Sequence, residues 1–178
     1  RNVWEIDPFA EISIFDGGLN EKNTKDFILK NPKLDIFIDE IDSIPMKILS
    51  RQICRAHRIP VLMVTDNGDG IIFDVERFDL EPKRQLLHGI MEHMNPREIQ
   101  NFDFKSWIKI ANKIIGLKSL DLRMKQSIAQ IGKTLSGVPQ LGTSAAVGAS
   151  LVSFVIRNIA NNQETPSGRY HIEFEKLI

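Results

Sequence analysis

The sequence predicts an α/β protein in which mostly parallel strands alternate with helices. Two apolar runs, at residues 34–38 and 61–64, are short and almost unbroken, which is typical of strands buried on both faces of a sheet. Segments with helical character surround them, so residues 11–78 predict the order β-α-β-α-β-β, as in the second half of a doubly wound sheet. A chain of 178 residues is long enough for one such domain with a sizeable core.

The first thirty residues predict the end of a helix, then a strand, then a second helix. Pro8 stops the first helix, because proline disfavours helical backbone at the residue before it. Apolar and polar residues alternate over residues 11–15, which predicts a strand. Asn20 is a suitable cap for a helix over about residues 21–30.

The next strand, residues 34–38, runs into four mostly acidic residues and then into a helix over about residues 44–57. Ser43 is a favourable N-cap residue for that helix. Pro45 falls in the first turn, where its missing N–H costs little. The pattern therefore predicts a strand end and a helix start that are joined by carboxylates.

A third strand is expected over residues 61–66, followed by a tight turn and a returning strand. The turn has the sequence "NGDG", which favours the left-handed backbone of hairpin turns. The returning strand, residues 70–78, is therefore expected to be antiparallel to its predecessor.

The rest of the chain changes character. Residues 79–103 contain few apolar periodicities and the breakers Pro82, Gly89 and Pro96, so mostly loop is expected. The remaining pattern predicts helices and a last strand over about residues 104–116, 119–132, 141–162 and 168–174. This gives the α/β half-domain at residues 1–82, a loop-rich connection at 83–103, and a helical extension with a terminal strand at 104–178, packed on the same domain.

Composition excludes several classes of function. Lys and Arg number 23, as do Asp and Glu, and this balance argues against a nucleic-acid binder or a polybasic membrane anchor. The single cysteine, Cys54, permits neither an internal disulfide nor a CxxC zinc pair, so we expect no zinc and a cytoplasmic location. Cys54 falls on the apolar side of a predicted helix and is expected to be a buried small side chain. The apolar stretch at residues 145–156 is closed by Arg157 and is expected to be a core or interface helix, with no membrane span.

Ligands of open α/β sheets bind at the carboxyl ends of the strands. Three such ends carry acidic residues here: Asp16, the stretch Asp39 to Asp42, and Thr65-Asp66. Asp42 lies beside a helix N-terminus, where an ionised carboxylate would be able to hold Mg²⁺ with a nucleotide phosphate. The competing interpretation is that Asp42 and Ser43 only cap the helix.

Other candidate motifs point to packing or are absent. His88 and His93 are five residues apart, which would place them on different helix faces, so two loop histidines are expected. No GxGxxG, GxxxxGK[ST] or GxSxG motif is present. Ala145, Ala149 and Ser153 repeat every four residues with Gly148 alongside, which favours close helix packing within the chain over a dimer seam.

These residues together resemble the ThiF/MoeB superfamily, adenylyltransferases related to ubiquitin-activating enzymes. The resemblance is carried by "EIDPFAEISIF", "DIFIDEIDS" and "RAHRIPVLMVTDNGDG". The strings "DVERFDLEP" and "PQLGTS…IRNI…PSGRYHIEF" look closer still to a bacterial ThiF-domain group of unassigned function, in which the domain can be fused to a nitroreductase-like module.

The resemblance implies an enzyme that binds Mg·ATP and joins its α-phosphate to a carboxylate, such as the C-terminus of a ubiquitin-like or sulfur-carrier protein, releasing pyrophosphate. The family's "DxxD" motif falls on Asp39 and Asp42, and its second Asp helps to hold Mg·ATP. Ser43 replaces the usual Asn, and Lys47 stands where many members carry Arg. The family's glycine loop and phosphate-binding residues would lie upstream of Arg1, so this chain is not expected to be catalytically complete.

Three functions are therefore compared. The leading expectation is a portion of a ThiF-like ATP-dependent adenylyltransferase. The alternative is a ThiF-like module without chemistry, which binds a partner or forms a homodimer. Part of a dinucleotide-dependent oxidoreductase is less favoured, because nothing in this sequence supplies the glycine fingerprint of that class.

Overall fold

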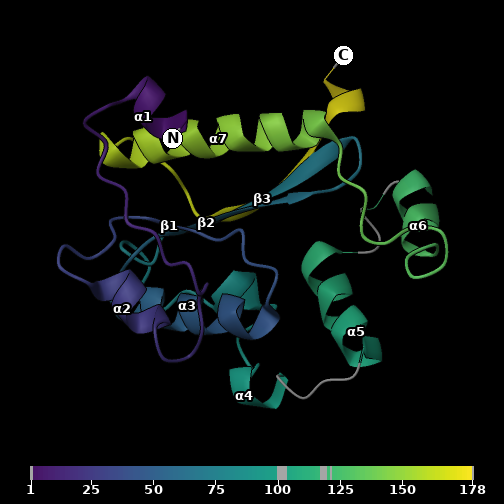
Figure 1. The fold of residues 1–178 in the computed structure, drawn as a ribbon, viewed down its shortest axis with the longest axis horizontal. Coiled ribbons are helices and arrows are strands. Elements are labelled where there is room, and N and C mark those ends of the chain that lie inside the picture. The colour runs from purple at the N-terminus through teal and green to yellow at the C-terminus, as the bar shows by residue number, and fades with distance from the viewer. Residues whose placement is uncertain (1, 100–103, 117–119, 121, 178) are drawn as a thin grey trace.

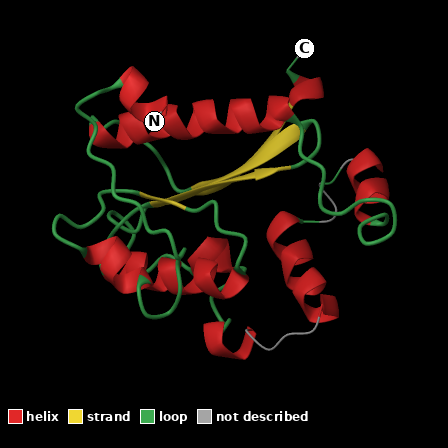
Figure 2. Cartoon of the chain, viewed as in Figure 1, coloured by secondary structure: helices red, strands yellow, loops and turns green. Residues whose placement is uncertain are grey.

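The computed structural model describes residues 2–99, 104–116, 120 and 122–177, and it places a sheet between two helical layers (Figure 1). Helix α7 covers one face of the sheet, and α2 and α3 cover the other (Figure 2). The α-helices are α1 (Asn2–Ile6), α2 (Thr24–Leu29), α3 (Ile44–Ala56), α4 (Pro96–Ile99), α5 (Phe104–Ile115), α6 (Leu122–Ile128) and α7 (Gly142–Ala160). The strands are β1 (Phe37–Ile38), β2 (Val61–Asp66), β3 (Gly70–Glu76) and β4 (Gly168–Glu173), and short 3₁₀ helices span Leu86–Gly89 and Phe174–Lys176.

The sheet has the strand order β1-β2-β3-β4. β1 and β2 are parallel, with Phe37 opposite Val61, whereas β3 is antiparallel to both β2 and β4. The terminal strand β4 pairs with β3 along its length, so residues near the C-terminus are built into the same sheet as β1. The α/β class, the parallel pair and the antiparallel return are therefore confirmed.

Each face of the sheet has its own apolar core, because successive residues of a strand point to opposite sides. Val61 and Met63 of β2 face α2 and α3 in the larger core, whereas Leu62 faces α7 in the smaller one. Cys54 is fully buried in the larger core, and burial raises the pKa of its thiol to about 12. The expectation of a buried cysteine is confirmed.

The predicted strand over residues 11–15 is wrong. These residues have no strand conformation, and Ile12 and Ile14 are exposed. The segment is anchored at its end, where the ring of Phe15 meets that of Phe27 in α2 at 4.9 Å between centroids. Its alternation of apolar and polar residues is real, but a strand also has to pair with a sheet edge, and this segment pairs with no described strand.

Several predicted elements are shorter in the structure. The helix expected from residue 21 begins at Thr24, because residues 20–23 form a turn in which the side chain of Asn20 accepts backbone hydrogen bonds. β1 contains only Phe37 and Ile38 of the five expected residues. The helix expected over 119–132 is α6, and part of that range lies outside the described residues.

Helix α7 is long and apolar enough to cross a membrane by length and composition alone, but it packs against the sheet. Its buried stripe is Ser144, Gly148, Val152 and Val155. The hydroxyl of Ser144 donates to the carbonyl oxygen of Gly68 at 2.6 Å and fixes the helix to the β2–β3 turn. Gly148 therefore packs within the chain, but against Val64 of the sheet and not against another helix as expected. The expectation of packing within the chain is wrong for the repeat Ala145, Ala149 and Ser153, which is exposed.

The other small residues of the α7 repeat lie on the opposite side of the helix. Ala145, Ala149 and Ser153 are exposed to solvent. A contact between two copies of the chain through this side remains a prediction.

Gly148→Leu should destabilise the fold. A Cβ atom at this position would lie 2.6 Å from Cγ1 of Val64, a β-branched side chain that has little freedom to move. Overpacking of this kind costs about 1–3 kcal/mol, measured as the free energy of urea unfolding. Ala149→Leu, on the exposed side of the same helix, should change it by less than about 0.5 kcal/mol. Equal losses for the two variants would contradict this packing.

Candidate functional site

The candidate site lies where β1 and β2 end. Because these strands are parallel, their carboxyl ends meet at one edge of the sheet, beside the N-terminus of α3. We call residues 39–43 and 65–66 the β1 rim. It contains the predicted site residues Asp39 and Asp42, together with Glu40 and Asp66.

Asp39 is fully buried and is held by two cations from α3. Its Oδ1 lies 3.1 Å from Nζ of Lys47, and its Oδ2 accepts a hydrogen bond from the guanidinium of Arg51. Oδ1 also accepts from the backbone N–H of Ile41 at 3.0 Å. Burial alone would raise the pKa of Asp39, but the charges of Arg51 and Lys47 hold that pKa below its usual range. Asp39 is thus ionised and fully engaged within the chain.

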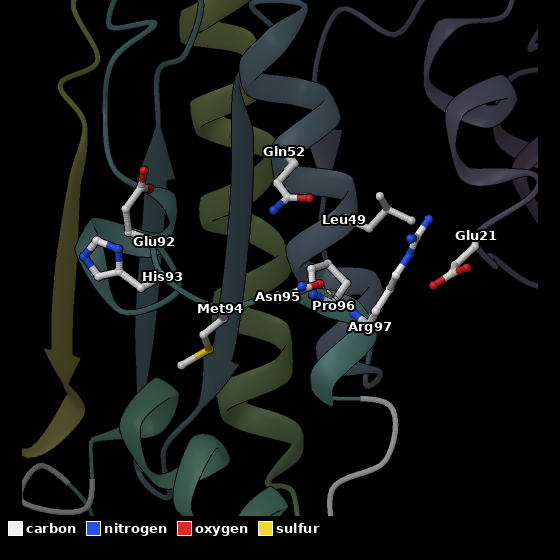
Figure 3. A pocket seen from close by; sticks show the side chains of 9 residues that line it. All are labelled: Glu21, Leu49, Gln52, Glu92, His93, Met94, Asn95, Pro96 and Arg97. Atoms are coloured by element: carbon white, nitrogen blue, oxygen red, sulfur yellow. Dashed lines mark hydrogen bonds between the residues drawn. The ribbon is translucent and has the colours of Figure 1, made fainter.

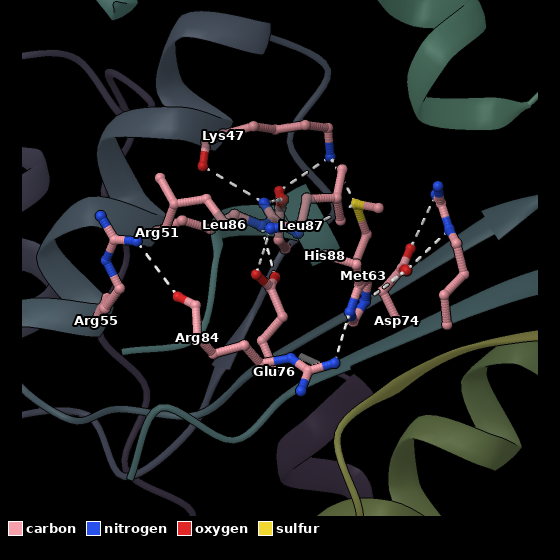
Figure 4. A network of polar contacts seen from close by, with 12 residues as sticks. Lys47, Arg51, Arg55, Met63, Asp74, Glu76, Arg84, Leu86, Leu87 and His88 are labelled. Carbon is pink, nitrogen blue, oxygen red and sulfur yellow. Dashed lines mark hydrogen bonds and ion pairs between the residues drawn. The ribbon is translucent and has the colours of Figure 1, made fainter. Parts of the chain in front are cut away.

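Arg51 extends this network into the centre of the sheet (Figure 4). The Nε of Arg51 donates to Oε2 of Glu76 on β3 at 2.7 Å. The side chains of Arg51, Asp39 and Glu76 are all completely buried. Glu76 in turn accepts a hydrogen bond from the backbone N–H of Leu87 at 2.6 Å. Burial disfavours the charge of Arg51, but Glu76 and Asp39 outweigh it and raise its pKa. Two buried acids are therefore balanced by Arg51 and its neighbour Lys47.

Lys47 is the part of this network nearest to solvent. Its side chain is 13% exposed and lies 3.4 Å from the sulfur of Met63. Burial is the main cause that lowers its pKa, and Arg51 adds to it, although Asp39 acts in the opposite direction. A partly exposed ammonium group at the strand ends provides positive charge where an anion would enter.

Two further rim carboxyls, those of Glu40 and Asp66, have pKa values above their usual range. Burial raises the pKa of Glu40, and the charges of Asp39 and Asp66 add to that rise. Glu40 also accepts from the backbone N–H of Val64 at 3.3 Å. Burial likewise raises the pKa of Asp66. The acids at the ends of β1 and β2 therefore influence one another electrostatically.

Asp42 is exposed, as are the rim residues Glu40 and Ser43, but unlike Glu40 it has no described hydrogen-bond partner. Ser43 occupies the N-cap position of α3, but its side chain makes no capping hydrogen bond. The structure describes no hydrogen bond or ion pair of Asp42 either. The interpretation of these two residues as a helix cap is therefore not supported by side-chain geometry, and Asp42 is an exposed rim carboxylate without a described partner.

Asp16 does not join the β1 rim. It is exposed in the turn that precedes α2, and no described contact connects it to Asp39 or Asp66. Among the residues that the structure describes, no group of three or more His, Cys, Asp or Glu side chains is placed to hold a metal ion together.

A second polar cluster, which the sequence analysis missed, lies along β3 (Figure 4). Buried Asp74 lies 3.0 Å from Nε2 of His88 and 3.0 Å from Nε of Arg169 on β4. The guanidinium of Arg84 approaches the other ring nitrogen of His88 at 3.0 Å. The available signal was Asp74 and Glu76 themselves, because two acids in an otherwise apolar strand require buried cationic partners.

His88 is therefore more than the loop histidine that was expected. Leu87 and His88 both have left-handed backbone, with φ of 45° and 54°, which is uncommon outside glycine. This conformation accompanies the hydrogen bond of the Leu87 N–H to Glu76 and the approach of the His88 ring to Asp74. His93 is exposed and does not share these partners, so the expectation that the two histidines act separately is confirmed.

A surface hollow of about 550 Å³ lies away from the β1 rim, beside α3 and α4 (Figure 3). It is lined by Glu21, Leu49, Gln52 and residues 92–97. The carboxylate of Glu92, which lines this hollow, already has two partners. It forms an ion pair with Arg55 at 2.8 Å and accepts a hydrogen bond from the backbone N–H of Leu86 at 2.8 Å. None of the β1 rim residues contributes to this hollow.

Comparison with known proteins finds similarity to Uncharacterized protein MT1398 of Mycobacterium tuberculosis (strain CDC 1551 / Oshkosh). The two are 31% identical over 178 residues, which is 100% of this chain and 24% of that protein. The chain thus spans about a quarter of the length of this relative. No protein-family model and no solved structure matches the chain.

Removing Arg51 should cost far more stability than removing its neighbour Arg55. Arg51→Met leaves Asp39 and Glu76 buried without a shared cation, which costs about 3–5 kcal/mol in urea unfolding. Arg55→Met breaks the ion pair with Glu92. The side chains of Arg55 and Glu92 are 26% and 22% exposed, so the loss should be roughly 1 kcal/mol or less. Similar losses would contradict a central role for Arg51.

The stability gained from Asp39 should depend on pH. Its pKa in the fold is below the usual value of 3.8, so its ionised form contributes fully above that value and the contribution is lost as the pH falls through the folded pKa. We expect the difference between the unfolding free energies of the native chain and Asp39→Asn to be constant above about pH 4 and to shrink as the pH is lowered further toward about 2. A difference that stays constant as the pH falls from about 4 to about 2 would show that the charge of Asp39 is not the stabilising property.

Proposed function

We propose that this chain is part of a longer ThiF-like, ATP-dependent adenylyltransferase, and that the β1 rim contributes one side of its Mg·ATP site. The observation that carries the proposal is the position of Asp42. Its carboxylate is exposed at the start of a 13-residue helix, with no described partner in the chain, beside a strand end that cations already hold in place. Such an oxygen donor suits Mg²⁺, which prefers one or two carboxylates together with phosphate oxygens.

Asp39 and Asp42 would have different roles in this site. The oxygens of Asp39 are occupied by Lys47 and Arg51, and one of them also accepts from the N–H of Ile41. Asp39 is therefore a positioning residue that fixes the loop carrying Asp42. This differs from the sequence-based expectation that Asp39 is a second nucleotide contact.

Lys47 fits a site for phosphate charge. Its ammonium group is partly exposed at the same edge and is already oriented by Asp39. When bound, Mg²⁺ would neutralise charge on the nucleotide phosphates, while Lys47 would add a second positive charge at the rim. The resemblance implies that the carboxylate to be activated belongs to a ubiquitin-like or sulfur-carrier protein, and it would have to approach this edge.

The missing parts of such a site would come from outside these residues. The chain has no glycine-rich phosphate loop, and it corresponds to 24% of its mycobacterial relative. A longer protein therefore has room for the loop and the further cations that adenylyl transfer requires.

Asp42→Asn in the longer protein should weaken the binding of Mg·ATP by at least about tenfold, with little change in melting temperature. The matched control is Asp35→Asn, an equally exposed residue before β1, at the opposite end of the strand from the rim. Isothermal titration calorimetry with Mg·ATP measures the affinities, and ATP–pyrophosphate exchange tests for chemistry. Unchanged affinity for Asp42→Asn would remove this role.

The second candidate is a ThiF-like module that binds a partner or dimerises without chemistry. The burial of Asp39 favours this candidate. Asp39, the first Asp of the DxxD motif, is completely buried and paired with Arg51, so a structural role is enough to explain it. In that case, the longer protein would neither bind Mg·ATP nor exchange pyrophosphate, with or without Asp42.

A further inference from the structure

Strand β1 has one edge without a partner in the described sheet. It lies at the end of the strand order, and it bonds only to the β2 side, through the N–H of Phe37 to Pro60 at 2.9 Å and the N–H of Asp39 to Leu62 at 2.8 Å. In a parallel strand, alternate residues direct their backbone groups to opposite neighbours. The N–H and C=O groups of Ile36 and Ile38 therefore point away from β2, toward the open edge.

The sequence of β1 is that of an interior strand. Residues 34–38 are almost entirely apolar, a pattern typical of parallel strands with neighbours on both sides. The opposite edge of the sheet, β4, carries Arg169, His171 and Glu173 at alternate positions, and charged residues are how natural edge strands avoid further pairing. β1 has no such protection, and its Ile38 side chain is 43% exposed.

The N-terminal segment is also apolar and uncovered. Among the exposed large apolar side chains in the described part of the chain, six lie within the first fourteen residues: Val3, Trp4, Ile6, Phe9, Ile12 and Ile14. In Figure 1 this segment runs from the level of α7 to the level of α2. Residues 11–15 have the alternation of a strand but do not pair with the free edge of β1.

We propose that the free edge of β1 binds an extended, apolar segment as an additional parallel strand, and that this segment belongs to the part of the longer protein outside these 178 residues. The length of the mycobacterial relative supports this occupant, because the chain corresponds to only 24% of it. The inserted strand would satisfy the backbone groups of Ile36 and Ile38 and cover the side chain of Ile38. The outer edge of the inserted strand would in turn be open to pairing by residues 11–15.

This inference goes beyond the proposed nucleotide site and does not depend on it. It rests on the backbone pairing of β1 and on exposed apolar side chains, whereas the nucleotide proposal rests on Asp42. The longer protein can therefore have a complete sheet whether or not it binds Mg·ATP, and the two proposals fail in different measurements.

Hydrogen–deuterium exchange on the intact longer protein tests the proposal. The backbone amides of Ile36 and Ile38 should exchange on the order of a hundredfold more slowly than amides at an unpaired edge, and residues 11–15 should be protected with them. Ile38→Lys should abolish the protection of residues 11–15 while the amides of α3 stay slow. Phe154→Lys is the matched control, since Phe154 is a similarly exposed apolar residue (48%) on the outer side of α7.

Each outcome decides the proposal. Slow exchange at Ile36 and Ile38 that is independent of protein concentration supports an inserted strand from the same chain. Fast exchange at both amides in the intact protein overturns it, because the edge is then open. Protection that appears only at high protein concentration also overturns it, since the occupant would then be a second copy. The native protein answers the question even if Ile38→Lys fails to fold.

Discussion

The interaction on which the rest of this structure depends is the buried guanidinium of Arg51. It joins α3 to the end of β1 through Asp39 and to β3 through Glu76, and so it links three elements across the sheet. Glu76 then holds the backbone of Leu87, which brings the loop after β3 against the same core. A charge with no solvent exposure is tolerated only when every partner is in place, which makes this arrangement sensitive to any shift of α3.

Much of the fold could be predicted because local sequence and tertiary packing agree. The helices at residues 44–56 and 142–160 and the hairpin of β2 and β3 have clear periodicity, helix starts or turn residues. The strand at residues 11–15 could not be predicted correctly, because its pattern is local whereas pairing requires an edge elsewhere. Only two residues of the apolar run at 34–38 form a ladder, because Phe37 is opposite Val61, the first residue of β2, and the residues before Phe37 have no β2 residue opposite them.

The sequence located the candidate rim but not its geometry. The rule that ligands bind at strand ends selected Asp16, the stretch Asp39 to Asp42 and Asp66, and the structure brings the last two together but leaves Asp16 apart. Sequence could not show which acid is buried and which is exposed, because that depends on Arg51 and Lys47 reaching back from α3. The cluster around Asp74 was missed because its partners, His88 and Arg169, are distant in sequence and have no fixed spacing.

The pairing of Asp74 with Arg169 has a consequence for how the chain acquires its structure. The two residues are 95 positions apart, and β4 adds a whole row of backbone bonds to β3 at the same time. During synthesis, β3 therefore cannot pair with β4 until β4 has been made. Until then, His88 is the described ion-pair partner of Asp74 that has already been synthesised. Such distant pairings slow folding, so the helical region between them forms before the sheet closes. A boundary drawn within residues 77–167 would separate the two halves of one folding unit.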